Sequence, residues 1–143
     1  MIACTFFGHK DTPKTIKPML RSVLIDLIKN KNVSMFYVGN HGSFDAIVKE
    51  ILSELKNEYS FNYSVVLAYI PTNKNVFDDF RDTVCPDGIE CVPHRYRINY
   101  RNKWMLKKSD YVVTYVKYIV GGAAYFKDLA QKQGKMVLNL VEF

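Results

Sequence analysis

The sequence has few of the features that mark exported or membrane proteins. It contains three cysteines among 143 residues, an odd number that does not suit a framework of disulfides, so we expect reduced thiols. The first ten residues, MIACTFFGHK, have no basic segment before their short apolar run, which argues against a signal peptide. The longest other apolar run, residues 65–70, is far shorter than the roughly 20 residues that a membrane-spanning helix needs. These absences predict a cytoplasmic protein with no membrane partner.

Metal-binding spacings and long charged segments are also missing. Cys85, Cys91 and His94 are close in sequence, but their spacing matches no standard zinc pattern, so we expect no metal and no cofactor. The net charge is +6, from 20 basic and 14 acidic residues, and would favour an anionic ligand or weak contact with nucleic acid. The basic residues are mostly scattered lysines without a run of five or six. We therefore interpret them as a solvated surface and treat nucleic acid as the less favoured partner.

Apolar runs of strand length alternate with stretches of helical period along the chain. The expected strands are residues 2–7, 35–38, 65–70, 89–92, 111–116 and 136–141, and the expected helices are residues 17–30, 43–57, 99–108 and 123–133. Residues 72–87 have the composition of a long loop with one helical turn near residues 77–81. This alternation is typical of βα units on a parallel sheet. We predict a single Rossmann-like α/β domain over residues 1–143, with three layers and a mostly parallel five- or six-stranded sheet.

Three glycine-bearing turns follow strands of the predicted sheet. They are residues 8–11, 39–43 and 120–123. Open parallel sheets bind ligands at the carboxyl ends of their strands, where the strand order reverses. If the first strand lies between the second and a later strand, the three turns converge there. Glycine lets the backbone approach a ligand, and a helix start offers free amides, so the turns predict a phosphate or ribose site. Any strand-to-helix turn also needs a glycine and a cap, and the purely structural alternative stays open.

Polar side chains on these turns could contact the ligand. His9 and His41 could hydrogen-bond a phosphate, act in acid-base chemistry or face solvent, and two histidines without a third ligand are too few for a metal. Ser43 or Asp45 could cap the second helix. Asp45 could instead accept hydrogen bonds from ribose hydroxyls.

Residues 95–105, RYRINYRNKWM, interleave arginine with aromatic residues. Such a pattern can bind nucleic acid through charge and stacking. On a helix, however, the spacing favours inward packing of the tryptophan and methionine, with Arg101 facing the ligand.

Several segments together resemble the SLOG superfamily, a group of Rossmann-like domains related to the cytokinin-activating LOG phosphoribohydrolases and to the DNA-processing protein DprA. They are FFGHK at residues 6–10, VGNHGSFD at 38–45, RNKWM at 101–105, SDYVV at 109–113 and GGA at 121–123. The resemblance covers nearly the whole chain. It implies a pocket for a nucleotide or a nucleotide-derived molecule at these turns. Some members cleave an N-glycosidic bond in nucleoside monophosphates, and others are thought to sense signalling nucleotides.

The enzymatic members of that superfamily carry a P-G-G-x-G-T-x-x-E motif. The matching stretch here is VGGAAYFKD at residues 120–128, which keeps the paired glycines and has Asp128 at the place of the glutamate. The proline and the Gly-Thr step are absent. This departure favours binding without catalysis.

The leading hypothesis is therefore a small binder or sensor of a nucleotide or nucleotide-derived molecule. The resemblance and the turns together assign its ligand-binding residues as Gly8, His9, Gly39, Asn40, His41, Gly42, Ser43, Asp45, Arg101, Gly121 and Gly122. A first alternative is an N-glycosidic hydrolase or deoxyribosyltransferase-like enzyme, with Asp45 or Asp128 as the catalytic carboxylate. A second is a DprA-like nucleic-acid binder that uses the +6 charge and residues 95–108. A homodimer is also possible, because many such domains pair through helix faces.

Overall fold

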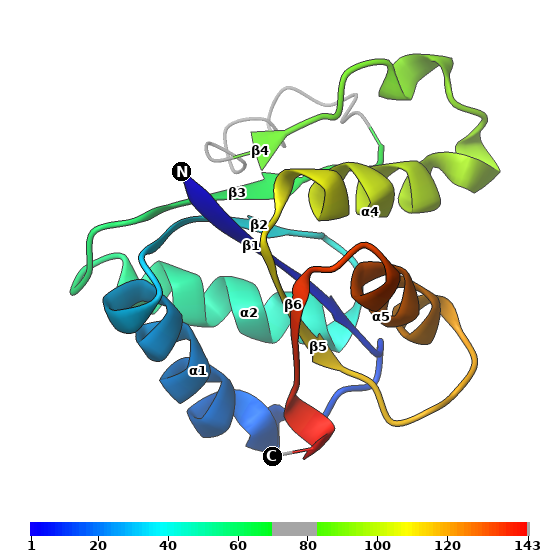
Figure 1. Ribbon diagram of the computed structural model, residues 1–143. Helices are drawn as coiled ribbons and strands as arrows, with labels where there is room; N and C mark the ends of the chain where they lie inside the picture. The colour runs from blue at the N-terminus through cyan, green and yellow to red at the C-terminus, as the bar shows by residue number, and fades with distance from the viewer. Residues whose placement is uncertain (70–82, 143) are drawn as a thin grey trace.

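The computed structural model of the protein describes residues 1–69 and 83–142. These residues form an all-parallel, six-stranded sheet in the order β4-β3-β2-β1-β5-β6 (Figure 1). The strands are β1 (Ile2–Gly8), β2 (Val33–Val38), β3 (Asn62–Val66), β4 (Thr83–Val84), β5 (Tyr111–Tyr115) and β6 (Met136–Asn139). The long helices are α1 (Lys17–Asn30), α2 (Gly42–Leu55), α4 (Arg97–Lys108) and α5 (Gly122–Lys132). The predicted Rossmann-like α/β architecture is confirmed.

Helices cover both faces of the sheet and bury two separate apolar cores. Helices α1 and α2 pack on one face, and α4 and α5 pack on the other (Figure 1). Because successive side chains of a strand point to opposite faces, β1 contributes to both cores. Phe6 stacks with Phe36 on the α1/α2 side, at 6.0 Å between ring centroids, and Phe7 stacks with Phe126 on the α4/α5 side, at 5.1 Å. This double burial explains why β1 is an almost continuous apolar run.

The strand order creates a point at which the direction of winding reverses. From β1 the chain proceeds outward through β2 and β3 to β4, and then returns to place β5 against the other edge of β1. Thr5 of β1 pairs with Tyr37 of β2 and also with Val112 of β5. The loops after β1, β2 and β5 therefore end at one edge, as the sequence predicts.

The predicted strand at residues 89–92 is wrong. Ile89–Cys91 form a 3₁₀ turn that starts after Gly88, whose φ is +80°. Ile89 is only 1% exposed, so its apolar character serves burial and not strand pairing. The fourth strand is instead the two-residue β4, which pairs with Val65 and Val66 of β3. The helical turn predicted at residues 77–81 lies outside the described residues.

Other strand ends also differ from the sequence prediction, most clearly those of β3 and β6. Strand β3 begins at Asn62 and ends at Val66, where residues 65–70 were expected. The last strand ends at Asn139, and Leu140–Glu142 turn into a 3₁₀ helix that buries Leu140. Both predictions assigned apolar residues to strands. In the structure, apolar residues after the end of each strand are buried without being part of it.

Charge is divided unequally between the two faces of the sheet. Helix α4 has five basic and no acidic residues, and α5 has two basic and one acidic, so together they carry +6. Helix α1 has three basic and one acidic residue, and α2 has one basic and three acidic, so their charges cancel. Ion pairs such as Lys17 with Glu50, at 2.7 Å, join α1 to α2. The positive charge of these helices is thus concentrated on the α4/α5 face.

Candidate functional site

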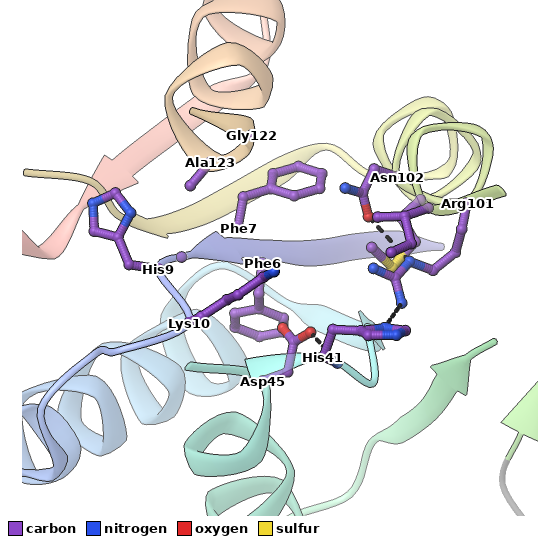
Figure 2. A pocket seen from close by; sticks show the side chains of 13 residues that line it. Phe6, Phe7, His9, Lys10, His41, Asp45, Arg101, Asn102, Gly122 and Ala123 are labelled. Carbon is purple, nitrogen blue, oxygen red and sulfur yellow. Dashed lines mark hydrogen bonds between the residues drawn. The ribbon is translucent and has the colours of Figure 1, made fainter. Parts of the chain in front are cut away.

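A cavity of about 220 Å³ lies at the carboxyl edge of the sheet, where the winding reverses. It opens between α4, the start of α5 and the turns that follow β1 and β2 (Figure 2). Its lining consists of Phe6, Phe7, Gly8, His9, Lys10, His41, Asp45, Ile98, Arg101, Asn102, Met105, Gly122 and Ala123. The lining combines apolar side chains from both cores with a small set of charged and polar groups.

The turn after β1 approaches the cavity through Gly8, His9 and Lys10. A Cβ on Gly8 would lie 2.3 Å from Cγ of Phe44, so this glycine is needed because α2 packs directly over the strand end. Nε2 of His9 accepts a hydrogen bond from the backbone amide of Lys117, at 2.9 Å. Nε2 is thus the nitrogen of the ring that accepts a hydrogen bond from the protein. Lys10 is exposed, which leaves its ammonium group available to an anion.

The turn after β2 places Gly39 between two charged groups of the cavity. A Cβ on Gly39 would lie 2.7 Å from Oδ2 of Asp45 and 3.0 Å from Nη1 of Arg101. Only a glycine lets both side chains approach the backbone so closely. Asp45 and Arg101 do not form an ion pair with each other within 4.0 Å, in the part of the chain that the structure describes. The Asp45 and Arg101 side chains are therefore held in place by contacts with other residues.

Asp45 is a buried carboxyl group in the first turn of α2. It is 9% exposed, and its Oδ2 accepts a hydrogen bond from the backbone amide of His41, at 3.0 Å. Burial raises the pKa of Asp45 above its ordinary value, and the His41 hydrogen bond and the charges of Arg101 and Lys49 only partly oppose this rise. A carboxyl group kept away from water in this way binds hydrogen-bond donors strongly.

Arg101 reaches the cavity from the inner face of α4 and is 3% exposed. Its Nε donates to Oδ1 of Asn102 at 3.0 Å, and its Nη1 lies 3.4 Å from Nδ1 of His41 (Figure 2). Nη1 also lies 3.4 Å from the carbonyl oxygen of Val66. These two longer contacts leave the guanidinium with donor capacity for a ligand. Burial lowers the pKa of Arg101, an effect that the Asp45 charge opposes. Burial and the positive charge of Arg101 likewise lower the pKa of His41.

Three predicted ligand-binding residues, Ser43, Gly42 and Asn40, do not line the cavity, and Ser43 joins the two turns. The backbone amide of Ser43 donates to the carbonyl oxygen of Lys10 at 2.9 Å, and its hydroxyl donates to that of Thr12 at 2.6 Å. Gly42 has a φ of +86°, and a Cβ there would lie 2.8 Å from Cα of Lys10. Asn40 accepts a hydrogen bond from Lys49. The Ser43 hydroxyl and the Asn40 side-chain oxygen thus bond to other parts of the protein.

The third predicted turn reaches the cavity only at its end. Gly122 lines the cavity, whereas Gly121, with a φ of +110°, precedes it. A Cβ on either glycine would meet no atom within 4 Å, so the approach to α5 is open. Asp128, one of the two candidate catalytic carboxylates, is exposed on α5 and is not part of the lining. Asp45 is the candidate carboxylate that the cavity contains.

The structure therefore brings together part of the predicted site and adds residues to it. Gly8, His9, His41, Asp45, Arg101 and Gly122 line the cavity, and Gly39, Asn40, Gly42, Ser43 and Gly121 lie outside its lining. Sequence reasoning missed the basic Lys10, the polar Asn102 and several apolar residues. A sequence signal for the residues that α4 places in the cavity was available. It is the helical spacing that puts four residues on one face of α4: Ile98, Arg101, Asn102 and Met105.

No metal or membrane feature is present among the described residues. In residues 1–69 and 83–142 no three histidine, cysteine or acidic side chains are grouped to hold a metal ion. Cys4, Cys85 and Cys91 are free thiols. None of the helices described for this chain has the length and apolar character required to cross a bilayer.

Comparisons with known proteins identify relatives of the fold. The sequence matches no family model and no curated protein. DNA processing protein A (DprA) from Streptococcus pneumoniae superposes with a TM-score of 0.69 at 13% identity, over 96% of this chain and 49% of that one. DprA from Helicobacter pylori, whose structure concerns its single-stranded DNA binding mode, gives 0.67 at 16% identity, over 95% of this chain and 63% of its own. This chain thus spans less than two thirds of either protein. The likeness shows that it has the Rossmann-like fold of the DprA proteins.

Proposed function

We propose that this domain binds single-stranded nucleic acid and holds one nucleotide unit in the cavity at the carboxyl edge of the sheet. The observation that carries the proposal is the placement of Arg101 and Lys10 in one cavity, beside the face on which the helix charges sum to +6. An arginine fork binds a phosphate through two parallel hydrogen bonds, and a lysine adds a mobile point charge. The single-stranded DNA binding of the Helicobacter pylori neighbour supports the same class of ligand.

The charge on α4 supports a polymer with several phosphates over a small anion. Lys103 and Lys107 are exposed and, four residues apart, lie on one side of the helix. Tyr96 and Tyr100, which are 48% and 37% exposed, continue the same side toward the start of α4. Basic groups that follow a phosphate backbone, together with aromatic rings on which bases stack, are typical of proteins that bind single strands.

The size of the cavity supports a second candidate, a free nucleotide or nucleotide derivative bound without catalysis. Small-molecule sites usually enclose about 300–1,000 Å³, and this cavity of about 220 Å³ would enclose part of one nucleotide but not a longer ligand. The two candidates share the cavity and differ in the use of the α4 surface. Competition between an oligonucleotide and a mononucleotide separates them.

The test is binding of a labelled single-stranded oligonucleotide, followed by fluorescence anisotropy over a series of salt concentrations. We expect the logarithm of the binding constant to fall linearly with the logarithm of salt concentration, by a slope of about 0.7 per phosphate contact. The Lys103→Ala, Lys107→Ala double variant should lower both the affinity and the slope. The matched control is Lys29→Ala with Lys31→Ala, which removes the same charge from exposed positions at the end of α1, on the other face.

A single variant tests the cavity itself. Lys10 is exposed and lines the cavity, so Lys10→Ala should weaken binding without loss of the fold.

Equal effects of the Lys103→Ala, Lys107→Ala variant and of its Lys29→Ala, Lys31→Ala control would show attraction by overall charge alone and contradict the proposed surface. A mononucleotide that competes as well as the oligonucleotide would favour the second candidate. Binding that does not depend on salt, or no binding, would refute the proposal.

A further inference from the structure

One oxygen of the Asp45 carboxyl group accepts no hydrogen bond from the described residues and is not sealed from solvent. Among the described residues, the only hydrogen bond to this group comes from the His41 amide and ends at Oδ2. No side-chain oxygen or nitrogen in the described part of the chain is both fully sealed from solvent and unpaired. Oδ1 of Asp45 therefore keeps contact with solvent, and the residue lines the cavity although as a whole it is 9% exposed. A buried acceptor in this position requires a donor from water or from a ligand.

The cavity holds groups of opposite chemical character. Arg101 and Lys10 offer donors with positive charge, and Asp45 offers carboxyl oxygens that accept hydrogen bonds (Figure 2). Arg101 and Asp45 flank Gly39, whose added Cβ would lie within 3.0 Å of both side chains, so these two groups are close together. A phosphate fits beside Arg101 and is repelled by Asp45. The group beside Asp45 must therefore be a hydrogen-bond donor that lies next to a phosphate in the ligand.

Within a nucleotide, the sugar is the part directly attached to the phosphate, and its hydroxyl groups are the nearest donors. In a nucleic-acid strand the 3′ oxygen is esterified, which leaves the 2′-hydroxyl of RNA as the free donor of the sugar. The amino groups of the bases are farther from the phosphate. A cavity of about 220 Å³, below the usual range of ligand sites, encloses a sugar and its phosphate more readily than a whole nucleotide.

We propose that Asp45 is a specificity-determining residue that accepts a hydrogen bond from the ribose 2′-hydroxyl, so that the cavity prefers ribonucleotides to deoxyribonucleotides. This inference rests on the proposed binding of a nucleotide unit in the cavity. A hydrogen bond to a charged acceptor corresponds to a preference of about 10- to 100-fold. The preference requires no contact with a base and is independent of sequence.

The experiment compares three labelled strands of one sequence, oligouridylate, oligodeoxyuridylate and 2′-O-methyl-oligouridylate. They share the base and the phosphates, and only the first can donate a hydrogen bond from the 2′ position. The wild-type protein should bind oligouridylate about 10- to 100-fold more tightly than either of the others. The methylated strand keeps the 2′ oxygen but exchanges the donor for a methyl group, whereas oligodeoxyuridylate loses the donor without added bulk, so weaker binding of both strands is the result expected.

The Asp45→Asn variant tests the residue. Its amide oxygen can still accept the His41 hydrogen bond, so we expect the fold to persist, as a thermal melt would verify. The preference for RNA should fall to within about threefold, while the affinity for oligodeoxyuridylate stays the same or rises as the negative charge disappears. Asp128→Asn, the same substitution at an exposed position outside the lining, should keep the full preference.

Equal affinity of the wild-type protein for the three strands would overturn the inference and leave the proposed function intact. A preference for oligodeoxyuridylate, or an RNA preference that persists in a folded Asp45→Asn variant, would also overturn it. Absence of binding to every strand would refute the proposed function and this inference together.

Discussion

Gly8→Ala tests the close packing of α2 over the end of β1. The new methyl group would lie 2.3 Å from Cγ and 2.4 Å from Cδ2 of Phe44, where ordinary contacts begin near 3.4 Å. The overlap is about 1 Å. Phe44 is 1% exposed and packs edge-on against Phe6 at 6.5 Å between ring centroids, so its ring has no free space to enter.

The expected cost follows from overpacking of a closed core. Extra methyl groups in well-packed cores cost about 1–3 kcal/mol, and this overlap belongs at the upper end. The loss of unfolded-state freedom offsets about 0.4–1 kcal/mol, because the backbone of Gly8 does not have a positive φ. We expect a net loss of about 2 kcal/mol in the free energy of unfolding and a fall of about 6–8 °C in Tm.

Urea denaturation of four proteins measures this effect: wild type, Gly8→Ala, Phe44→Ala and the double variant. Phe44→Ala alone should cost about 3–5 kcal/mol. The double variant should be more stable than the sum of the two changes by about 1–2 kcal/mol, because the new methyl group occupies part of the space that the ring leaves. Gly122→Ala is the control, since its Cβ would meet no atom within 4 Å. Additive effects at Gly8 and Phe44, or equal melting of Gly8→Ala and wild type, would refute the packing argument.

Three further predictions concern the cavity and the thiols. Gly39→Ala should push apart the groups on either side of it, because its Cβ would lie 2.7 Å from Oδ2 of Asp45, and anisotropy should show about tenfold weaker binding of oligouridylate; unchanged affinity would contradict it. Because burial raises the pKa of Asp45, the folded protein takes up this proton at higher pH than the unfolded chain, and stability falls as pH rises through that window. Asp45→Asn should therefore match or exceed wild-type stability in neutral urea titrations, with the difference shrinking on acidification, and a less stable variant at neutral pH would oppose this. A thiol reagent should modify the exposed Cys91 quickly and Cys4 only on unfolding, since burial strongly raises the pKa of Cys4, and rapid native labelling of Cys4 would count against the core assignment.

The order of helices and strands could be predicted from periodicity, but the exact strand ends could not. Helix α1 has the predicted bounds because its apolar residues recur at helical spacing over four turns. Ile89 and Leu140 were assigned to strands because they are apolar. In the structure both are buried in 3₁₀ turns, since burial is decided by neighbours from distant parts of the chain. A short apolar run does not distinguish these outcomes.

The candidate site was predictable in position and less so in composition. Parallel topology alone indicated the edge at which the turns meet. The sequence did not show that Gly8 is required by Phe44 or that Ser43 bonds to Lys10, because both depend on how α2 approaches the first turn. The net charge of each predicted helix could have been counted from the sequence. The unequal charge of the two faces of the sheet follows only when the structure shows which helices cover which face.

The hydrogen bonds of Ser43 to Lys10 and Thr12 have a consequence for how the protein opens. They fasten the loop after β1 to the first turn of α2, and Thr12 in turn donates to the carbonyl oxygen of His9. We therefore expect the loop after β1 and the first turn of α2 to unfold together. The Ser43 amide should then exchange its hydrogen slowly, although it lies next to a loop. Because these hydrogen bonds need no ligand, we expect the wall of the cavity to be ordered before a ligand arrives. Little conformational entropy is then lost on binding, and affinity is set by contacts instead of by rearrangement.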